Sequence, residues 1–185
     1  NTGAFAMQGP NDSRRPPNVE GEPLTASMWI ADNLGEKVVE LGVFPFGQNR
    51  ILGERTRFAL SEDSLYVGTS ATGASEAYDH EGERIRTIDS RATKRLSSDA
   101  NYEKAVDDLI TFSGADVETM DRARATYSSL PKPDSLPAFS EIFVNPQGFL
   151  WVELSFPGDE TTILRAIEPR GTIMGDLHLP VDLRV

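Results

Sequence analysis

An internal repeat constrains the fold of this 185-residue chain more than any other feature of its sequence. One copy runs from Phe58 to Ile85 and the other from Ile142 to Met174. In each copy a short strand is followed by a turn, a Leu-aromatic-Val strand, a longer turn, a third strand, a turn that ends in glycine and a fourth strand. Four antiparallel strands in this order form one blade of a β-propeller. The repeat therefore predicts two blades, although two similar hairpin pairs in an ordinary β-sandwich would give the same pattern.

Short runs of β-forming residues, separated by polar turns, extend this pattern over most of the chain. Upstream of the first copy, Asn33-Leu34-Gly35-Glu36 is a hairpin signal between two such runs. We therefore expect a mainly β, antiparallel fold. The expected strands are Met28–Ala31, Lys37–Phe44, Thr56–Leu60, Leu65–Gly68, Ala74–Tyr78, Arg84–Ile88, Ala138–Val144, Phe149–Leu154, Thr161–Ile167 and Thr172–Leu179.

Residues 97–130 interrupt the β pattern with two amphipathic segments and predict an inserted helical hairpin. The first segment places five apolar residues at the spacing of one helix face: Tyr102, Ala105, Val106, Leu109 and Ile110. Ser98 or Asp99 is placed to cap this helix, and Gly114 to end it. The second segment begins with the capping-box pattern Ser113-Gly114-Ala115-Asp116. A thinner apolar stripe follows in it: Val117, Met120, Ala123, Tyr127 and Leu130.

Residues 1–27 carry four prolines among polar residues and show no apolar period. They predict an extended, proline-rich leader ahead of a partial propeller domain over 28–185. The leader is expected either to stay loosely ordered or to gain order by lying on a partner. Because the chain does not begin with methionine, we expect either processing or a longer protein.

Composition excludes several classes of function. The 29 acidic residues outnumber the 18 basic ones, which gives a net charge of −11. An acidic chain is a poor ligand for nucleic acid, because binding requires cations that displace counterions from phosphates. The absence of cysteine excludes disulfides, thiolate metal sites and a cysteine nucleophile. No apolar run approaches the roughly 20 residues that a membrane-spanning helix needs.

Two motifs resemble the bacterial six-bladed β-propellers of the NHL and TolB-like kind. One is the turn Tyr78-Asp79-His80-Glu81-Gly82, and the other is the strand Gly148-Phe149-Leu150-Trp151-Val152. The resemblance covers about residues 28–180, and it includes a helical segment between two blades; Pro169-Arg170 departs from the usual Asp-Gly turn. It implies a ring of six blades, of which this sequence holds about two and a half. We therefore expect a longer protein, a partner chain against the blades, or a compact β-sandwich-like domain with the helices over one face.

Residues that could carry chemistry are few. His80 and His178 are the two histidines, and each is expected on a solvated turn or strand rather than at a metal or an active site. Asp79-His80-Glu81-Gly82 is too short for a calcium loop. Neighbouring carboxylates, such as Asp159 and Glu160, are expected on solvated turns. The sequence therefore predicts no catalytic, cofactor-binding or metal-binding residue.

A cluster of basic residues is the most distinctive charge feature of this acidic chain. Five cations lie within twelve residues of one another: Arg84, Arg86, Arg91, Lys94 and Arg95. Arg84 and Arg86 are expected on one strand face, opposite Ile85. The cluster is either a solvated outer strand or a docking patch for an acidic partner or anionic lipid headgroups, to which Arg14 and Arg15 would add.

These features favour a non-catalytic interaction or scaffold subunit whose partners are other protein subunits. A periplasmic accessory protein, extrinsic to the membrane and stabilising a larger bacterial complex, fits them; a photosynthetic reaction centre with its antenna is one example. The alternative is a fragment of a propeller enzyme or ligand-binding protein that acts on sugars, lactones or peptides. A soluble sensor domain is a third possibility that the sequence does not separate from the first.

Overall fold

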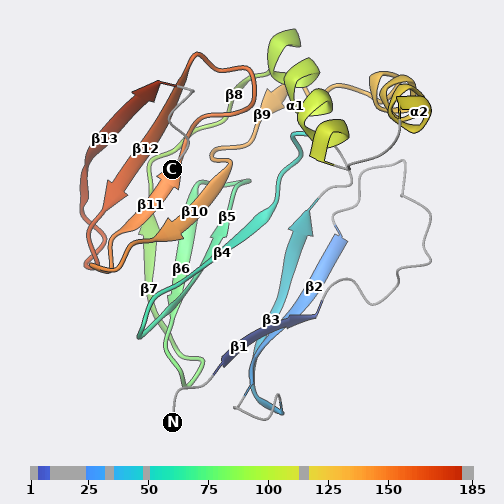
Figure 1. Cartoon of the computed structure of the whole chain (residues 1–185). Helices are drawn as coiled ribbons and strands as arrows, with labels where there is room; N and C mark the ends of the chain where they lie inside the picture. The colour runs from blue at the N-terminus through green and yellow to red at the C-terminus, as the bar shows by residue number, and fades with distance from the viewer. Residues whose placement is uncertain (1–3, 9–23, 32–35, 48–50, 113–116, 181–185) are drawn as a thin grey trace.

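The computed structural model of this chain describes residues 4–8, 24–31, 36–47, 51–112 and 117–180. Within these ranges the fold is mainly β, with antiparallel four-stranded sheets and two helices (Figure 1). In every sheet of three or four strands, the strands lie side by side in chain order. The predicted fold class, antiparallel blade-like sheets with an inserted helical hairpin, is confirmed.

Two four-stranded meanders correspond to the two copies of the repeat. The central sheet contains β4 (Thr56–Leu60), β5 (Leu65–Thr69), β6 (Ala74–Tyr78) and β7 (Arg84–Asp89). The outer sheet contains β10 (Glu141–Val144), β11 (Leu150–Glu153), β12 (Thr161–Ile167) and β13 (Ile173–Pro180). All eight strands were predicted, most of them within a residue or two of these bounds.

A polar residue and a glycine fix the tight turns of these meanders. In the β6–β7 turn, Asp79 Oδ1 accepts two backbone N–H groups at 3.0 and 2.9 Å, and Gly82 has a φ of 83°. In the β10–β11 turn, Asn145 Oδ1 accepts two backbone N–H groups at 3.1 and 2.9 Å, and Gly148 has a φ of 81°. Because a residue with a Cβ is strained at such φ values, these glycines set where each hairpin reverses.

A third, N-terminal sheet precedes the central one. It contains β1 (Ala4–Gln8), β2 (Leu24–Ala31) and β3 (Lys37–Gly47), all antiparallel. The sheet thus includes parts of the predicted leader 1–27 and begins upstream of the predicted domain boundary at Met28. The predicted hairpin turn falls largely on residues 32–35, which lie outside the described residues.

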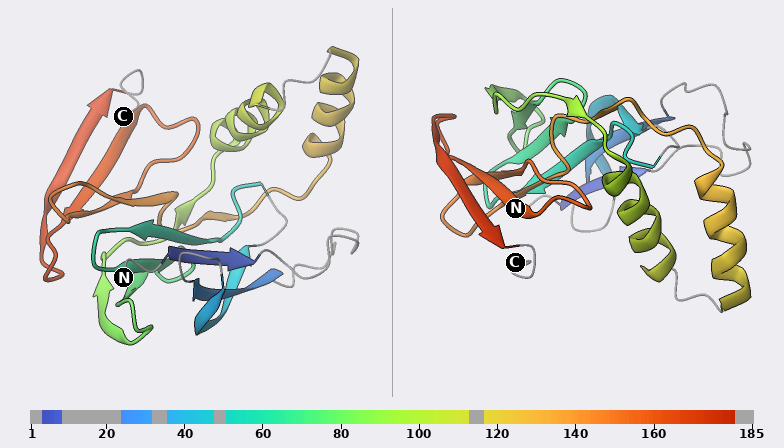
Figure 2. Two further views of the ribbon diagram at one scale, coloured as in Figure 1. Left: turned by 60° about the horizontal axis from the view of Figure 1, so that its bottom comes forward. Right: turned by 90° about the horizontal axis from the view of Figure 1, so that it is seen from above.

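The core lies on both sides of the central sheet, which is stacked between the other two (Figures 1 and 2). One face packs on the N-terminal sheet through Met28, Leu65, Val67 and Tyr78. The other face packs on the outer sheet through a larger buried cluster: Ala59, Tyr66, Ala77, Ile88, Ala92, Ala138, Phe139, Ile142, Leu150, Val152 and Ile167. Burial of this apolar surface is the main favourable term that holds the sheets together.

The helical hairpin leaves the sheets between two short paired strands, β8 (Arg95–Leu96) and β9 (Ser135–Leu136). It comprises α1 (Asp99–Phe112) and α2 (Val117–Ser128), which extend away from the sheets (Figure 2). The predicted insertion is confirmed, and three residues of the predicted apolar face are buried against α2: Tyr102, Val106 and Ile110. No helix in the described part of the chain is long and apolar enough to cross a membrane.

Ser98 caps α1, as one of the two predicted capping residues. Its Oγ accepts the backbone N–H of Asn101 at 3.1 Å, and the Asn101 Oδ1 accepts the backbone N–H of Ser98 at 3.2 Å. This reciprocal pair satisfies backbone donors that the first helical turn leaves unpaired. The predicted stop at Gly114 and the capping box 113–116 lie outside the described residues.

Candidate functional site

A concave cleft of about 1040 Å³ lies between the helical hairpin and the outer sheet. Its floor contains the approach to β4 and the segment before β10. Strands β10 to β12 form one wall, and α1, the end of α2 and the chain after α2 form the other. Its apolar lining includes Leu109, Leu130, Phe139, Phe143, Phe156 and Leu164. The volume is slightly above the roughly 300–1000 Å³ of typical small-molecule sites.

Two arginines lie at the floor of this cleft. Arg57 Nε donates to the Ser140 carbonyl oxygen at 2.8 Å, and its Nη1 is 3.4 Å from a Glu141 carboxylate oxygen. Arg55 is also among the residues that line the cleft, although the residue as a whole is exposed. Desolvation there lowers the pKa of Arg55, with repulsion from Arg57 second and attraction to Glu141 opposing it. The guanidinium stays protonated at physiological pH, so the floor carries two positive charges beside Glu141.

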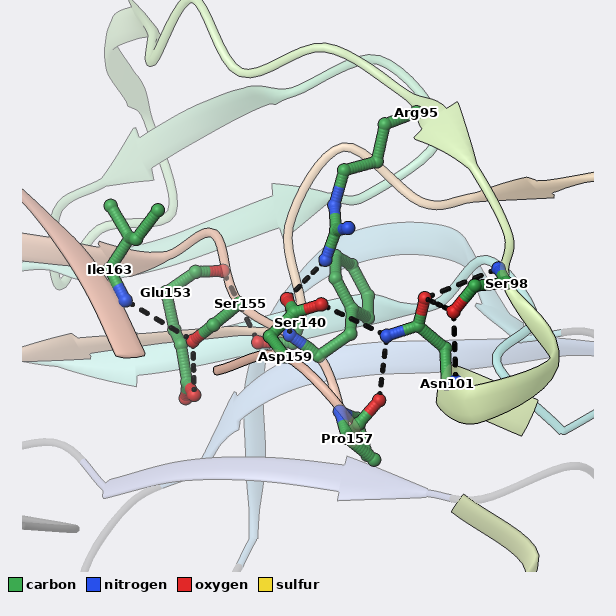
Figure 3. A network of polar contacts seen from close by, with 10 residues as sticks. Arg95, Ser98, Asn101, Ser140, Glu153, Ser155, Pro157, Asp159 and Ile163 are labelled. Atoms are coloured by element: carbon green, nitrogen blue, oxygen red, sulfur yellow. Dashed lines mark hydrogen bonds and ion pairs between the residues drawn. The ribbon is translucent and has the colours of Figure 1, made fainter. Parts of the chain in front are cut away.

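A polar network at one end of the cleft ties the hairpin to the outer sheet (Figure 3). Asn101 Nδ2 donates to the Pro157 carbonyl oxygen at 2.7 Å and to Asp159 Oδ1 at 2.9 Å. Arg95 forms an ion pair with Asp159 and places its guanidinium carbon 5.5 Å from the centre of the Phe156 ring. Because these contacts join β8, the start of α1 and the β11–β12 turn, they hold the two walls of the cleft at a fixed separation.

Two carboxylates lie side by side on the sheet wall of the cleft. Glu141 and Glu153 are cross-strand partners on β10 and β11, and both line the cleft. Glu141 pairs with Arg57, whereas Glu153 Oε1 accepts a hydrogen bond from the Ser155 hydroxyl at 3.1 Å (Figure 3). Within the described part of the chain, Glu153 forms no ion pair.

The outward face of the outer sheet repeats a surface that is buried elsewhere in the molecule. Tyr66 lies in a cross-strand row with Ala59 and Ala77, and this row is buried against the outer sheet. The same positions of the second copy form the row Phe143, Trp151 and Ala166. These three residues are only partly buried, and the Phe143 and Trp151 rings stack with centroids 6.2 Å apart. The face that receives the next sheet in the first copy is thus at the surface in the second.

The predicted basic cluster is distributed over several local contacts. Arg86 and Arg91 form no ion pair within the ranges that the structure covers, and Arg14 and Arg15 lie outside the described residues. The other three cations are engaged by carboxylates of this chain: Arg84 by Glu76 at 2.6 Å, Lys94 by Glu54, and Arg95 by Asp159. These internal pairs leave less free positive charge than the sequence implies.

The expectation that Arg84 and Arg86 share one strand face is wrong. Arg84 lies opposite Tyr78 and Arg86 opposite Ala77, with a register shift between the two pairs. Tyr78 and Ala77 point to opposite faces of the central sheet, because one packs on the N-terminal sheet and the other on the outer sheet. The extra residue of this β-bulge reverses the alternation of side chains, so the two arginines point to opposite faces.

Apart from Arg95, which belongs to the predicted basic cluster, the sequence assigned no functional role to the residues of the cleft and its network. Asp159 was expected on a solvated turn, but its side chain is 18% exposed and accepts contacts from three directions. Arg57 lies on β4 and Arg55 lies directly before it. The sequence predicted this strand correctly but indicated no function for either arginine. The signal that could have identified Asp159 is its place in a Pro-Gly-Asp turn, where a carboxylate often binds nearby backbone N–H groups; here it accepts the Phe156 N–H at 2.8 Å.

The two histidines take no part in the cleft. His80 Nε2 lies 3.1 Å from the carbonyl oxygen of Glu62, and His178 lies exposed on β13. Among the residues that the structure describes, no group of three or more His, Asp or Glu side chains could hold a metal ion.

No protein-family model matches this chain, and no curated protein matches it either. The cleft and the outward sheet face, which share Phe143, are therefore the features from which we infer a function.

Proposed function

We propose that this chain is a non-catalytic interaction subunit and that it docks a partner protein on the outward face of the outer sheet. One observation carries the proposal: the row centred on Trp151 repeats the row centred on Tyr66, which is buried against a neighbouring sheet. Equivalent positions of a repeat favour equivalent packing. A β-sheet that lays apolar side chains over Trp151 is therefore the partner surface that this face fits.

The composition of the face supports docking. Leu177 on β13 is 45% exposed and lies in the same cross-strand row as Leu164 and Glu153. Aromatic and aliphatic residues at the centre with carboxylates at the rim are typical of protein interfaces. Tryptophan is also among the residues that most often carry binding energy. The exposed apolar groups of this face thus favour a protein partner over bulk solvent.

The finer parts of the proposal come from the sequence. We propose that the stacked four-stranded sheets belong to a partial six-bladed propeller of the NHL or TolB-like kind. An extracytoplasmic site on a bacterial membrane complex, and a photosynthetic complex in particular, stay predictions. The basic cluster also stays a prediction as a partner-binding patch, and we favour the sheet face because three cations of the cluster already have carboxylate partners.

The test is to isolate the tagged chain with its partner from the native host under gentle conditions. Ala166→Arg changes the docking face, whereas Thr172→Arg adds the same charge on an exposed turn. Both should leave the free energy of unfolding within about 0.5 kcal/mol, as surface substitutions usually do. We expect native mass spectrometry to show a defined partner with wild type and Thr172→Arg. The purified partner should bind Ala166→Arg at least about tenfold more weakly, which corresponds to roughly 1.4 kcal/mol.

Two outcomes would overturn the proposal. One is a native species that contains this chain and carries no partner. The other is a purified partner that binds Ala166→Arg as tightly as wild type, because the sheet face would then be irrelevant to association.

A second candidate function, ligand binding, is favoured by the cleft itself. A concavity of about 1040 Å³ with an apolar lining and a few convergent charged groups is the usual form of a binding site. Saturable binding of a small molecule in the cleft, with no protein partner in the native host, would favour this candidate.

A further inference from the structure

The charges inside the cleft are almost all matched by partners within the chain. Arg57 pairs with Glu141, and Lys104 pairs with Asp108 four residues further along α1. Arg55 is different: it lines the cleft and, within the described ranges, forms no ion pair. It lies near enough to Glu141 to feel its charge, but Glu141 is engaged by Arg57. The floor of the cleft thus presents one cation that lacks a counter-charge.

Glu153 is the complementary feature on the sheet wall. Its carboxylate accepts one hydroxyl hydrogen bond from Ser155 and has room for further donors. A ligand that pairs with both Arg55 and Glu153 must carry an anion and an N–H donor. The C-terminal residue of a polypeptide carries both groups, since its amide nitrogen is bonded to the Cα that bears the terminal carboxylate.

The remaining surface of the cleft is apolar. Leu109 is 43% exposed and Leu130 is 39% exposed, and both line the helical wall. Phe143 lines the opposite wall. Leu109 belongs to the apolar face of α1, but it does not join the cluster that holds α1 to α2. Aliphatic side chains placed between these walls would remove the exposed apolar area of all three residues from water.

We propose that the cleft binds the C-terminal segment of a partner polypeptide, with its terminal carboxylate on Arg55 and its apolar side chains between Leu109 and Phe143. This inference rests on the proposed function in one respect only, that the segment belongs to the docked partner. A guanidinium binds a carboxylate through two parallel N–H···O hydrogen bonds. A phosphate is disfavoured, because its second negative charge would lie near Glu141 and Glu153.

The test uses two peptides that differ only at their C-terminus: acetyl-Ala-Ala-Leu-Leu as the free acid and as the amide. Binding to the full chain is followed by tryptophan fluorescence, because Trp151 stacks on Phe143 of the cleft wall, and by calorimetry. We expect the acid to bind roughly ten- to hundredfold more tightly than the amide, the range of a hydrogen bond to a charged group. An internal aspartate peptide with an amidated end should bind like the amide.

Substitutions assign the effect to Arg55. In Arg55→Gln the acid should bind as weakly as the amide, whereas Arg55→Lys should keep part of the preference because it keeps the charge. Arg170→Gln removes an exposed arginine from the β12–β13 turn and should behave as wild type. The hydrogen bonds printed for Arg55 within the described residues come from its backbone: its N–H donates to the Ser70 hydroxyl oxygen at 2.7 Å, and its carbonyl oxygen accepts the Ser70 N–H at 3.0 Å. Arg55→Gln keeps both bonds and should therefore fold normally.

Three results would overturn the inference: equal binding of acid and amide, no binding of either peptide up to millimolar concentration, or an acid preference that survives in Arg55→Gln. Displacement of the acid by inorganic phosphate as readily as by acetate would also overturn it, because the site would then be an unselective anion site. Ala166→Arg separates this inference from the proposed function, since it should leave peptide binding unchanged. Peptide binding without any partner on the sheet face would refute the proposed function alone.

Discussion

Gly158 lies where the β11–β12 turn meets the first turn of α1, and it has no room for a side chain. Its φ is 86°, in the left-handed region. A Cβ at this position would lie 2.5 Å from the carbonyl oxygen of Ala100 and 2.9 Å from the backbone nitrogen of Asn101. We predict that Gly158→Ala destabilises the protein and loosens the hairpin from the outer sheet.

The expected magnitude has two parts. The left-handed backbone of an alanine costs about 1–2 kcal/mol. Relief of the contact requires the turn and the helix to separate by about an ångström, which lengthens the 2.7 Å bond from Asn101 to the Pro157 carbonyl and costs about 1–2 kcal/mol more. The total of about 2–4 kcal/mol is a large fraction of the roughly 5–15 kcal/mol that stabilises a typical domain.

Gly148→Ala is the matched control. Its φ of 81° is nearly the same, but the nearest atom to an added Cβ is the Pro169 Cγ at 3.5 Å, an ordinary contact. This variant should therefore lose only the backbone part, about 1–2 kcal/mol. The difference between the two variants isolates the contact between the turn and the helix.

Urea unfolding followed by circular dichroism measures the free energy of unfolding of both variants. Amide hydrogen exchange in the first turn of α1 should accelerate in Gly158→Ala and stay unchanged in Gly148→Ala. Equal losses of stability in the two variants, with unchanged exchange in α1, would refute the account of a hairpin held against the outer sheet at Gly158.

Three further predictions concern the sheets. Arg165 donates two hydrogen bonds to Asp176, at 2.7 and 2.8 Å, and lowers the pKa of the Asp176 carboxyl. The pair should stabilise the fold above pH 4 and lose that effect as the pH falls further. Urea midpoints at pH 7 and pH 3 should show this acid dependence in wild type and its loss in Asp176→Asn. Burial first, and the Glu76 carboxylate second, raise the pKa of Tyr78 to about 12; its contribution should be intact below pH 10 and lost between pH 10 and 12, which the absorbance of tyrosinate measures. Phe139 is 1% exposed between the sheets, so Phe139→Ala should cost about 3–5 kcal/mol of unfolding free energy.

Each of these predictions has a result that contradicts it. If wild type and Asp176→Asn lose equal amounts of stability between pH 7 and pH 3, the ion pair with Arg165 does not cause the acid dependence. If every tyrosine titrates near pH 10, the partly buried hydrogen bond from Tyr78 to Glu76 does not raise the pKa of Tyr78. A loss of less than about 1 kcal/mol in Phe139→Ala would show that the interface between the central and outer sheets is not the main core.

The blades were predictable because local signals act together in them. Alternating apolar residues set the strands, and turn residues such as Asp79 and Gly82 set their ends. The helices were predictable for a similar reason, since the apolar face of α1 and its Ser98 cap are both short-range features. In each case the physical cause lies within about ten residues of its effect.

The features that could not be predicted from the sequence depend on contacts between segments that are distant along the chain. Asp159 meets Arg95 across 64 residues, and nothing near either residue indicates the pairing. The two-residue strands β8 and β9 are too short to have a periodic pattern. β1 was missed because its five residues are an isolated run among prolines and polar residues. The bulge that separates Arg84 from Arg86 follows from the packing of the sheet, which a two-residue alternation does not encode.

The repeat also indicates what a docked sheet must look like. In the central sheet the row around Tyr66 has the small residues Ala59 and Ala77 on either side, so the outer sheet can approach closely. In the outer sheet the position of Ala59 is taken by Phe143, whose ring stacks on Trp151 with an interplanar angle of 7°. A partner that packed as the outer sheet does would collide with this ring. Its docking face must therefore carry small residues opposite Phe143 and larger ones opposite Ala166, where the row is still open.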